Sequence, residues 1–273
     1  MFDTDFVVKH YTPASGDARN EDDRLSSKHG SVEFLTTMRY IDKFLSPNVA
    51  IIEIGAGTGR YSHALARKGH AVDAIELVPY NIEIFQSKTG PGEKITVTQG
   101  DARNLSMFND AKYDITLLLG PLYHMFTIED KRQTINEALR VTKPGGVVFA
   151  AYCMSDASLM LDGLKNNRFS IKDLINRGFI NADTFETRSD PEMIFELVRK
   201  EHIDEIMKVY DVERLHFVAT DLYTRHMREA IDAMDEDTFA LYLRYHFAIC
   251  ERADMIGFSH HALDIFRKEK SIS

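Results

Sequence analysis

Residues 51–61 read Ile51-Ile52-Glu53-Ile54-Gly55-Ala56-Gly57-Thr58-Gly59-Arg60-Tyr61, and this stretch decides the fold. Its apolar first half predicts a short strand that is covered on both faces, as in a parallel sheet. Its glycines predict a turn in which the backbone can approach a ligand closely and adopt φ values that other residues avoid. A helix that begins near Arg60 would point free N–H groups and a partial positive charge at that ligand. The stretch therefore predicts a strand, a ligand-binding turn and a helix in direct succession.

The glycine spacing separates two classes of cofactor. Dinucleotide sites use G-x-G-x-x-G, whose last glycine permits tight packing of the helix on the strand. Here the spacing is G-x-G-x-G, and Arg60 occupies the position of the third dinucleotide glycine, which disfavours NAD and FAD. The stretch instead resembles the first motif, E-x-G-x-G-x-G, of the class I S-adenosylmethionine (SAM)-dependent methyltransferases, with Glu53 at the acidic position. A nicotinamide oxidoreductase and a SAM-binding protein without catalytic activity are the alternatives from other classes.

Further stretches follow in the order that this family has. Residues 71–75 predict a second strand that ends at Glu76, where a carboxylate can accept hydrogen bonds from ribose hydroxyls. Gly100-Asp101-Ala102 follows a third predicted strand, and the resemblance implies that Asp101 faces the adenine amino group. Residues 143–146, Lys-Pro-Gly-Gly, precede a fifth strand, as they do in the family. The resemblance extends over the first half of the chain and concerns both the fold and the cofactor.

The loop after the fourth predicted strand is the candidate reaction site, because ligands of an open α/β sheet lie beyond the carboxyl ends of its strands. Its sequence, Gly120-Pro121-Leu122-Tyr123-His124, resembles one bacterial branch of the family, in which the loop contacts the methionine part of SAM and the acceptor. Tyr123 and His124 are our catalytic candidates, since an acceptor hydroxyl needs a base whereas a carboxylate is already ionised. The loop lacks the D/N-P-P-Y motif of many amino-methylating relatives, which weighs against adenine- or glutamine-type amide acceptors.

The resemblance implies SAM as the cofactor and S-adenosylhomocysteine as the product, and we expect no metal site. The residues expected at the cofactor lie in the glycine turn and after strands two, three and four: Glu53, Gly55, Ala56, Gly57, Thr58, Gly59, Arg60, Glu76, Leu77, Asp101, Ala102, Leu119 and Gly120.

The succession of strand-like and helix-like segments predicts a doubly wound α/β fold, with a seven-stranded Rossmann-like sheet and a helical lid. We expect an N-terminal arm over residues 1–30 and a SAM-binding core over residues 31–154. A helical lid segment is expected over residues 155–195, inserted between strands five and six. The end of the core is expected over residues 196–273, with strands six and seven at 215–219 and 262–266 and a second lid segment at 222–252.

The arm and the lid segments supply the candidate substrate residues, which are cationic and aromatic side chains. Together they would form a pocket for an anionic acceptor. The candidates are Tyr11, His29, Arg188, Tyr223, Arg225, His226 and Tyr245. We therefore expect methyl transfer to an oxygen, of a carboxylate or a hydroxyl, on a small metabolite or on a peptide or natural-product precursor. Methyl transfer to a nitrogen of a small molecule is the alternative.

Composition excludes several classes of partner. The 273 residues carry a net charge of -9, which disfavours bulk binding of nucleic acid because phosphate contacts need clustered Lys and Arg. We find no secretory signal and no apolar run of transmembrane length, so we expect no membrane partner. Two cysteines, Cys153 and Cys250, make no disulfide framework and indicate a reducing, cytoplasmic location. We expect a monomer or a homodimer.

Overall fold

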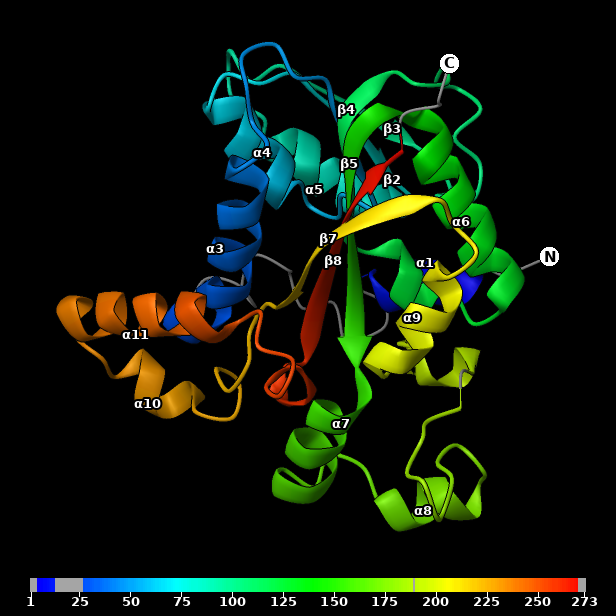
Figure 1. Cartoon of the computed structure of the whole chain (residues 1–273), viewed down its shortest axis with the longest axis vertical. Helices are drawn as coiled ribbons and strands as arrows, with labels where there is room; N and C mark the ends of the chain where they lie inside the picture. Colours follow the sequence, from blue (N-terminus) through cyan, green and yellow to red (C-terminus); the bar gives the residue numbers. More distant parts are fainter. Residues whose placement is uncertain (1–3, 13–26, 189, 270–273) are drawn as a thin grey trace.

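The computed structural model of the chain describes residues 4–12, 27–188 and 190–269. Its centre is one mixed sheet with the strand order β3-β2-β1-β4-β5-β8-β7 (Figure 1). The segment 13–26 of the predicted N-terminal arm lies outside the described residues.

The first five strands of the sheet are parallel, and the last two form an antiparallel pair. The five parallel strands are β1 (Ile51–Ile54), β2 (Val72–Glu76), β3 (Ile95–Gln99), β4 (Tyr113–Leu118) and β5 (Thr142–Met154). The antiparallel pair consists of β7 (Val212–Ala219) and β8 (His261–Lys268), and β8 also pairs antiparallel with β5. A two-residue strand, β6 (Leu197–Val198), pairs with the end of β5. This arrangement confirms the predicted doubly wound α/β fold.

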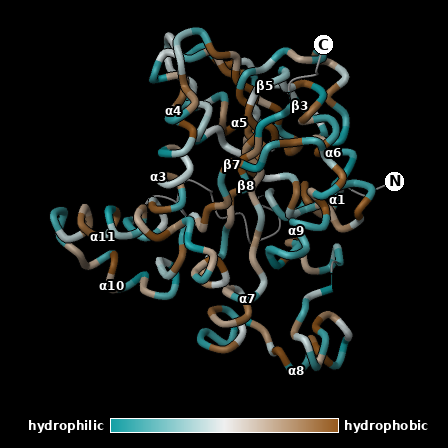
Figure 2. The backbone as a smooth tube through the Cα atoms, in the orientation of Figure 1, coloured by the Kyte–Doolittle hydropathy of each residue, from teal (hydrophilic) through white to brown (hydrophobic). Residues whose placement is uncertain are grey.

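Helices cover both faces of the sheet. Figure 1 shows α3 (Lys28–Asp42), α4 (Arg60–Arg67) and α5 (Pro79–Lys88) on one side of the strands. On the other side lie α6 (Ile128–Val141) and α9 (Lys200–Met207). This two-sided cover explains why the central strands are apolar on both faces. All four residues of β1 are buried, Glu53 included, and apolar stretches follow the central strands (Figure 2).

The remaining elements are short or lie beyond the edge of the sheet. They are α1 (Asp5–His10), η2 (Pro121–His124), α7 (Ser155–Ser158), the π-helix η3 (Leu159–Lys165), α8 (Ile171–Asn176), η4 (Pro191–Met193), α10 (Arg228–Asp232), α11 (Glu236–Ile249) and η5 (Ile256–Phe258).

Several boundaries differ from the sequence-based expectation. The core, expected from residue 31, begins earlier with α3, because the hydroxyl of Ser27 caps this helix by accepting a hydrogen bond from the Gly30 N–H at 3.1 Å. Strand β5 begins at Thr142 rather than at residue 147, since its first residues pair with the start of β4. The expected arm also contains the short helix α1, which the sequence did not reveal.

The two expected lid segments each have apolar contacts of their own. Helices α10 and α11 pack on α3, where Ile231 and Phe239 form a small cluster with Val32. The segment that follows β5 forms another separate cluster around Leu159 and Phe179. The second segment also reaches the main core of the sheet, where Leu222 and Cys250 are buried.

Candidate active site

A cavity lies at the carboxyl ends of the parallel strands. Its walls come from the glycine turn after β1, the ends of β2 and β3, the loop after β4, helix α1, helix α3 and the start of β8. Its lining includes the polar, charged and glycine residues Tyr11, Glu33, Thr37, Glu53, Gly55, Gly57, Thr58, Arg60, Glu76, Asp101, Arg103, Gly120, Tyr123, His124, Thr220 and His261.

The glycine turn, residues 55–59, exposes backbone to the cavity, and we call it the cofactor cradle. Gly57 has φ +54°, and a Cβ placed there would meet no atom within 4 Å, so its backbone is open to a ligand. Gly59 has φ +87°, and its Cβ would lie 2.7 Å from the ring of Phe85. The Oγ1 atom of Thr58 is buried and has no hydrogen-bond partner among the described residues. A ligand seated on this turn would supply the missing partner.

Glu76 is the last residue of β2, and its carboxylate accepts hydrogen bonds from the backbone of the glycine turn and of the residues that follow β2. One oxygen accepts a hydrogen bond from the N–H of Gly57 at 2.7 Å. The other accepts from the N–H of Val78 at 2.9 Å and from the side chain of Asn81 at 3.1 Å. Burial raises the pKa of Glu76, although these hydrogen bonds oppose the effect. The carboxylate therefore lies next to the cradle, where the sequence expected a partner for ribose hydroxyls.

The second buried acid, Glu53, lies beneath the turn. It is 1% exposed, and it accepts hydrogen bonds from the backbone N–H and the hydroxyl of Ser62. Burial raises the pKa of Glu53 to about 8, against the opposing effect of Ser62. The acid joins β1 to the first turn of α4 and still lines the cavity.

Asp101 follows β3 and is held by an arginine. The guanidinium of Arg103 donates to both oxygens of Asp101 and also to Asp130 at 3.1 Å. Burial raises the pKa of Asp101, but the hydrogen bonds and charge of Arg103 outweigh burial and lower it overall. Asp101 is therefore ionised and fixed at the edge of the cavity.

His124 lies in the loop after β4 and is fixed as a neutral imidazole. Its Nδ1 lies 2.9 Å from the carbonyl oxygen of Ile194, which can only accept, so Nδ1 carries the proton. Its Nε2 must then accept the hydrogen bond from the hydroxyl of Tyr11, 3.1 Å away. Burial lowers the pKa of His124 to about 4, so the ring is uncharged at neutral pH. Helix α1 thereby brings the phenol of Tyr11 into the cavity.

The backbone that supports His124 is strained. Ile194 has φ +57°, which is rare for a β-branched residue. The next residues are bonded to the loop, since the N–H of Glu196 donates to the carbonyl of Tyr123 at 2.8 Å and Lys131 bonds the Glu196 carboxylate at 2.5 Å.

Tyr123, the other catalytic candidate, donates its hydroxyl to the carbonyl of Leu119 at 3.1 Å. The Tyr123 hydroxyl therefore stabilises the loop, whereas the Tyr11 hydroxyl bonds the ring of His124.

The structure brings together most of the residues expected at the cofactor. All of them line the cavity except Gly59, whose position is set by packing on Phe85. Both catalytic candidates line it as well.

Of the expected substrate residues, Tyr11 lines the cavity and the others do not. His29 pairs with Asp232 at 2.7 Å, and Arg188 pairs with Asp190 at 2.9 Å. The side chains that the structure places outside the cavity are His29, Arg188, Tyr223, Arg225, His226 and Tyr245. They belong to α3, to the segment after α8 and to the α10 and α11 region, whose apolar contacts lie elsewhere.

Sequence reasoning missed a group of polar residues at the far end of the cavity. Glu33 comes from α3, Thr220 follows β7, and His261 begins β8. Burial lowers the pKa of His261, but Glu33 and Asp221 outweigh burial and raise it to about 10. These residues are far apart in the chain and belong to no motif, so only the pairing of β7 with β8 could have indicated their proximity.

Comparison with known proteins agrees with this geometry. Residues 51–146 match the family model described as a methyltransferase domain. The ubiquinone biosynthesis O-methyltransferase of Methylocella silvestris is 31% identical over 130 residues, which cover 46% of this chain and 48% of that protein. The 2-methyl-6-phytyl-1,4-hydroquinone methyltransferase of Synechocystis is 30% identical over 137 residues, 50% of this chain and 42% of that protein. The chain thus spans less than half the length of these curated relatives.

Solved structures extend the likeness of fold beyond the matched domain. The crystal structure of a SAM-dependent methyltransferase from Methanosarcina mazei aligns with a TM-score of 0.58 at 18% identity, covering 85% of this chain and 98% of that one. Residues 51–146 therefore form a methyltransferase domain, and SAM is the cofactor of the class I methyltransferases that the sequence resembles. The predicted family resemblance and fold class are confirmed. No helix in the described part of the chain is long and apolar enough to span a membrane.

Proposed function

We propose that this chain transfers the methyl group of SAM to a hydroxyl oxygen of a small molecule. The observation that carries the proposal is the Tyr11–His124 pair, which lies in the same cavity as the glycine turn. When bound, SAM supplies a methyl group on a sulfonium, which an acceptor oxygen can attack in line. The chain has to hold the two partners in this geometry, and orientation alone can supply about 7–11 kcal/mol of the barrier.

The residues present fit the cofactor. Gly57 leaves its backbone open, Thr58 has a buried hydroxyl without a partner among the described residues, and Glu76 ends β2 beside them. These residues would hold the nucleoside and the amino-acid part at the ends of β1 and β2. The loop after β4 would then border the reacting methyl group.

Tyr11 and His124 select an acceptor that carries a proton. Because His124 Nε2 accepts the phenolic proton, a lone pair of the Tyr11 oxygen can accept a hydrogen bond from an acceptor hydroxyl. As the acceptor oxygen forms its bond to carbon, its proton passes to the Tyr11 oxygen and the Tyr11 proton passes to Nε2. His124, with a pKa of about 4, would release that proton again to solvent. The products are a methyl ether and S-adenosylhomocysteine.

A hydroxyl fits this cavity better than a carboxylate does. A carboxylate has no proton for Tyr11 to accept, and it would need cations to position it. The cationic residues expected for that purpose, Arg188 and Arg225, lie outside the cavity. Two cations that do line it, Arg103 and His261, already pair with Asp101 and Asp221. The relatives that match the domain include one named as an O-methyltransferase and one named as a hydroquinone methyltransferase. Of these two names, the first states methyl transfer to oxygen, in keeping with a hydroxyl acceptor.

The test is transfer of labelled methyl from SAM into cell extract that has been separated by size, followed by brief treatment with alkali. We expect label in the small-molecule fraction that survives alkali and that product analysis assigns to an ether. Release of the label as methanol would show a methyl ester, and label on nitrogen would show an amine; either result would refute the hydroxyl acceptor. SAM binding without transfer to any fraction would favour a non-catalytic binding protein.

Two variants test the role of the pair. Tyr11→Phe removes the oxygen but keeps the ring, and we expect a loss of about 100-fold in transfer, within the usual range for proton transfer by a side chain. Affinity for S-adenosylhomocysteine should be unchanged. Tyr245→Phe is the matched control, because Tyr245 is 56% exposed and lies outside the cavity. Equal rates for Tyr11→Phe and Tyr245→Phe would refute the role of Tyr11.

A further inference from the structure

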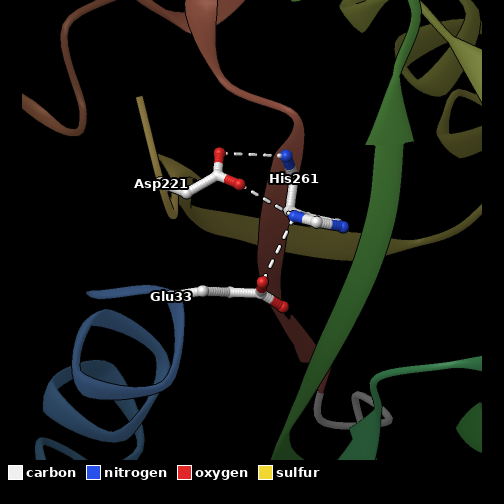
Figure 3. Close-up of side chains that lie close together, drawn as sticks. All are labelled: Glu33, Asp221 and His261. Atoms are coloured by element: carbon white, nitrogen blue, oxygen red, sulfur yellow. Dashed lines mark hydrogen bonds and ion pairs between the residues drawn. The ribbon is translucent and has the colours of Figure 1, made fainter. Parts of the chain in front are cut away.

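Three side chains from distant parts of the chain converge where Glu33 and His261 line the cavity. Figure 3 shows the imidazole of His261 between the carboxylates of Asp221 and Glu33. Since β8 is antiparallel to β5, its first residue, His261, lies at the same edge as the carboxyl ends of the parallel strands. Asp221 follows the end of β7 at that edge, and Glu33 reaches it from α3.

The three donor atoms surround one point. The Nδ1 atom of His261 lies 2.9 Å from Oδ2 of Asp221 and 3.3 Å from Oε2 of Glu33. All three atoms lie within 4.8 Å of one another. From these three lengths, a single point lies within about 2.5 Å of every donor, close to the distances at which proteins bind divalent cations. A cation at this point would need little movement of its ligands.

The carboxylate of Asp221 is fixed by hydrogen bonds to Oδ1, the oxygen that does not pair with the His261 ring. Its Oδ1 accepts hydrogen bonds from the hydroxyl of Ser259 at 2.6 Å and from the backbone N–H of His260 at 2.8 Å. These donors fix the plane of the carboxylate, and its Oδ2 faces His261 and Glu33. Ligating carboxylates typically have such outer hydrogen bonds, which orient them for the ion.

We propose that Glu33, Asp221 and His261 bind a divalent first-row transition-metal cation, such as Mn²⁺ or Zn²⁺. Two carboxylate oxygens and one imidazole nitrogen form a mixed donor set that suits these ions better than the all-oxygen sites of Ca²⁺ or Mg²⁺. The ion would replace the proton on Nδ1, and the two carboxylates would balance its charge. The sequence alone led us to expect no metal site, because the three ligands have no motif spacing.

The position of the site connects it to the reaction. Glu33 and His261 line the same cavity as the glycine turn and the Tyr11–His124 pair. Three protein ligands leave coordination positions on the cavity side for water or for an oxygen of the acceptor. This part of the inference rests on the proposed function: a bound cation would orient the acceptor and lower the pKa of its hydroxyl.

The test is titration of the chelator-treated full chain with Mn²⁺, followed by electron paramagnetic resonance of the free ion. We expect one site per chain, with affinity reduced more than about 100-fold in His261→Ala, beyond the 10- to 100-fold loss typical of outer-shell changes. Glu33→Gln is the second variant, since it keeps the size of a side chain on α3 and should fold. The matched control is His216→Ala, which removes a similar pair, His216 with Glu251 at 2.8 Å, outside the cavity.

The outcomes separate this inference from the proposed function. No binding of Mn²⁺ or Zn²⁺ by the wild-type chain, or unchanged binding in both His261→Ala and Glu33→Gln, would overturn the metal site. Neither result requires an acceptor. Tyr11→Phe should impair methyl transfer and leave Mn²⁺ affinity unchanged. Binding of Mn²⁺ that depends on Glu33 and His261 would support the site even if no methyl transfer were found.

Discussion

Replacement of Gly57 by valine is the sharpest test of the glycine turn. Gly57 has φ +54°, and the position of its Cβ has no neighbour within 4 Å. Valine there would not collide with the protein, so the fold should survive. Its side chain would instead project into the cavity that Gly57 lines.

The size of the effect follows from two separate costs. Holding an L-residue in the left-handed region costs about 1–2 kcal/mol of folding free energy. Forcing extra methyl groups into a packed contact costs about 1–3 kcal/mol, which would lower cofactor affinity by about 5- to 150-fold. The first cost should appear as reduced stability, and the second only when the cofactor binds.

Gly92→Val is the matched control. Gly92 has φ +92°, also has no neighbour within 4 Å of its Cβ position, and lies outside the cavity. Both variants should therefore lose similar stability in urea unfolding. In isothermal titration with S-adenosylhomocysteine, only Gly57→Val should lose affinity. Unchanged affinity in Gly57→Val, or an equal loss in Gly92→Val, would refute the assignment of the turn as the cofactor cradle.

Three further predictions concern other residues of the chain. Glu76→Ala should weaken S-adenosylhomocysteine binding by about 1–3 kcal/mol in the same titration, because the charged acceptor next to Gly57 is lost; an unaffected Kd would make Glu76 structural. Tyr123→Phe should keep most methyl transfer, since its hydroxyl donates to the backbone carbonyl of Leu119 within the loop, and a loss as large as that of Tyr11→Phe would contradict this. Burial lowers the pKa values of His124 and His246 to about 4, below the unfolded value of about 6.5. Because the unfolded chain then binds more protons at these two histidines, each of them lowers the free energy of unfolding as pH drops from about 6.5 to about 4, while Glu53, with its raised pKa, contributes with the opposite sign. Urea unfolding at several pH values checks this, and an unchanged slope in His246→Leu would count against it.

The cofactor half of the site was predictable because its residues follow one another in the chain. Strand β1, the glycine turn and α4 are contiguous, Glu76 ends β2, and Asp101 follows β3. In a parallel sheet such strand ends must meet at one edge, so the order of the motifs already defines the site. The sequence did not reveal that Glu76 also bonds the backbone of Gly57 and so shapes the turn itself.

The acceptor half was much less predictable. Helical periodicity indicated helices over residues 222–252 but could not indicate their partner, and α11 turns Phe239 and His246 toward α3 rather than toward the cavity. His261 and Glu33 meet only because β8 runs antiparallel at the edge where α3 packs. Tyr11 was singled out from the arm, but its bond to His124 depends on α1, which the sequence did not predict.

The central claim is that the cavity at the carboxyl ends of the strands is a SAM site. The most direct measurement is isothermal titration of the full chain with S-adenosylhomocysteine and, in parallel, with NAD. We predict saturable binding of one S-adenosylhomocysteine per chain and no binding of NAD, because Arg60 replaces the glycine that a dinucleotide site needs. Binding of NAD in the absence of S-adenosylhomocysteine binding would contradict the account and indicate a nicotinamide enzyme instead.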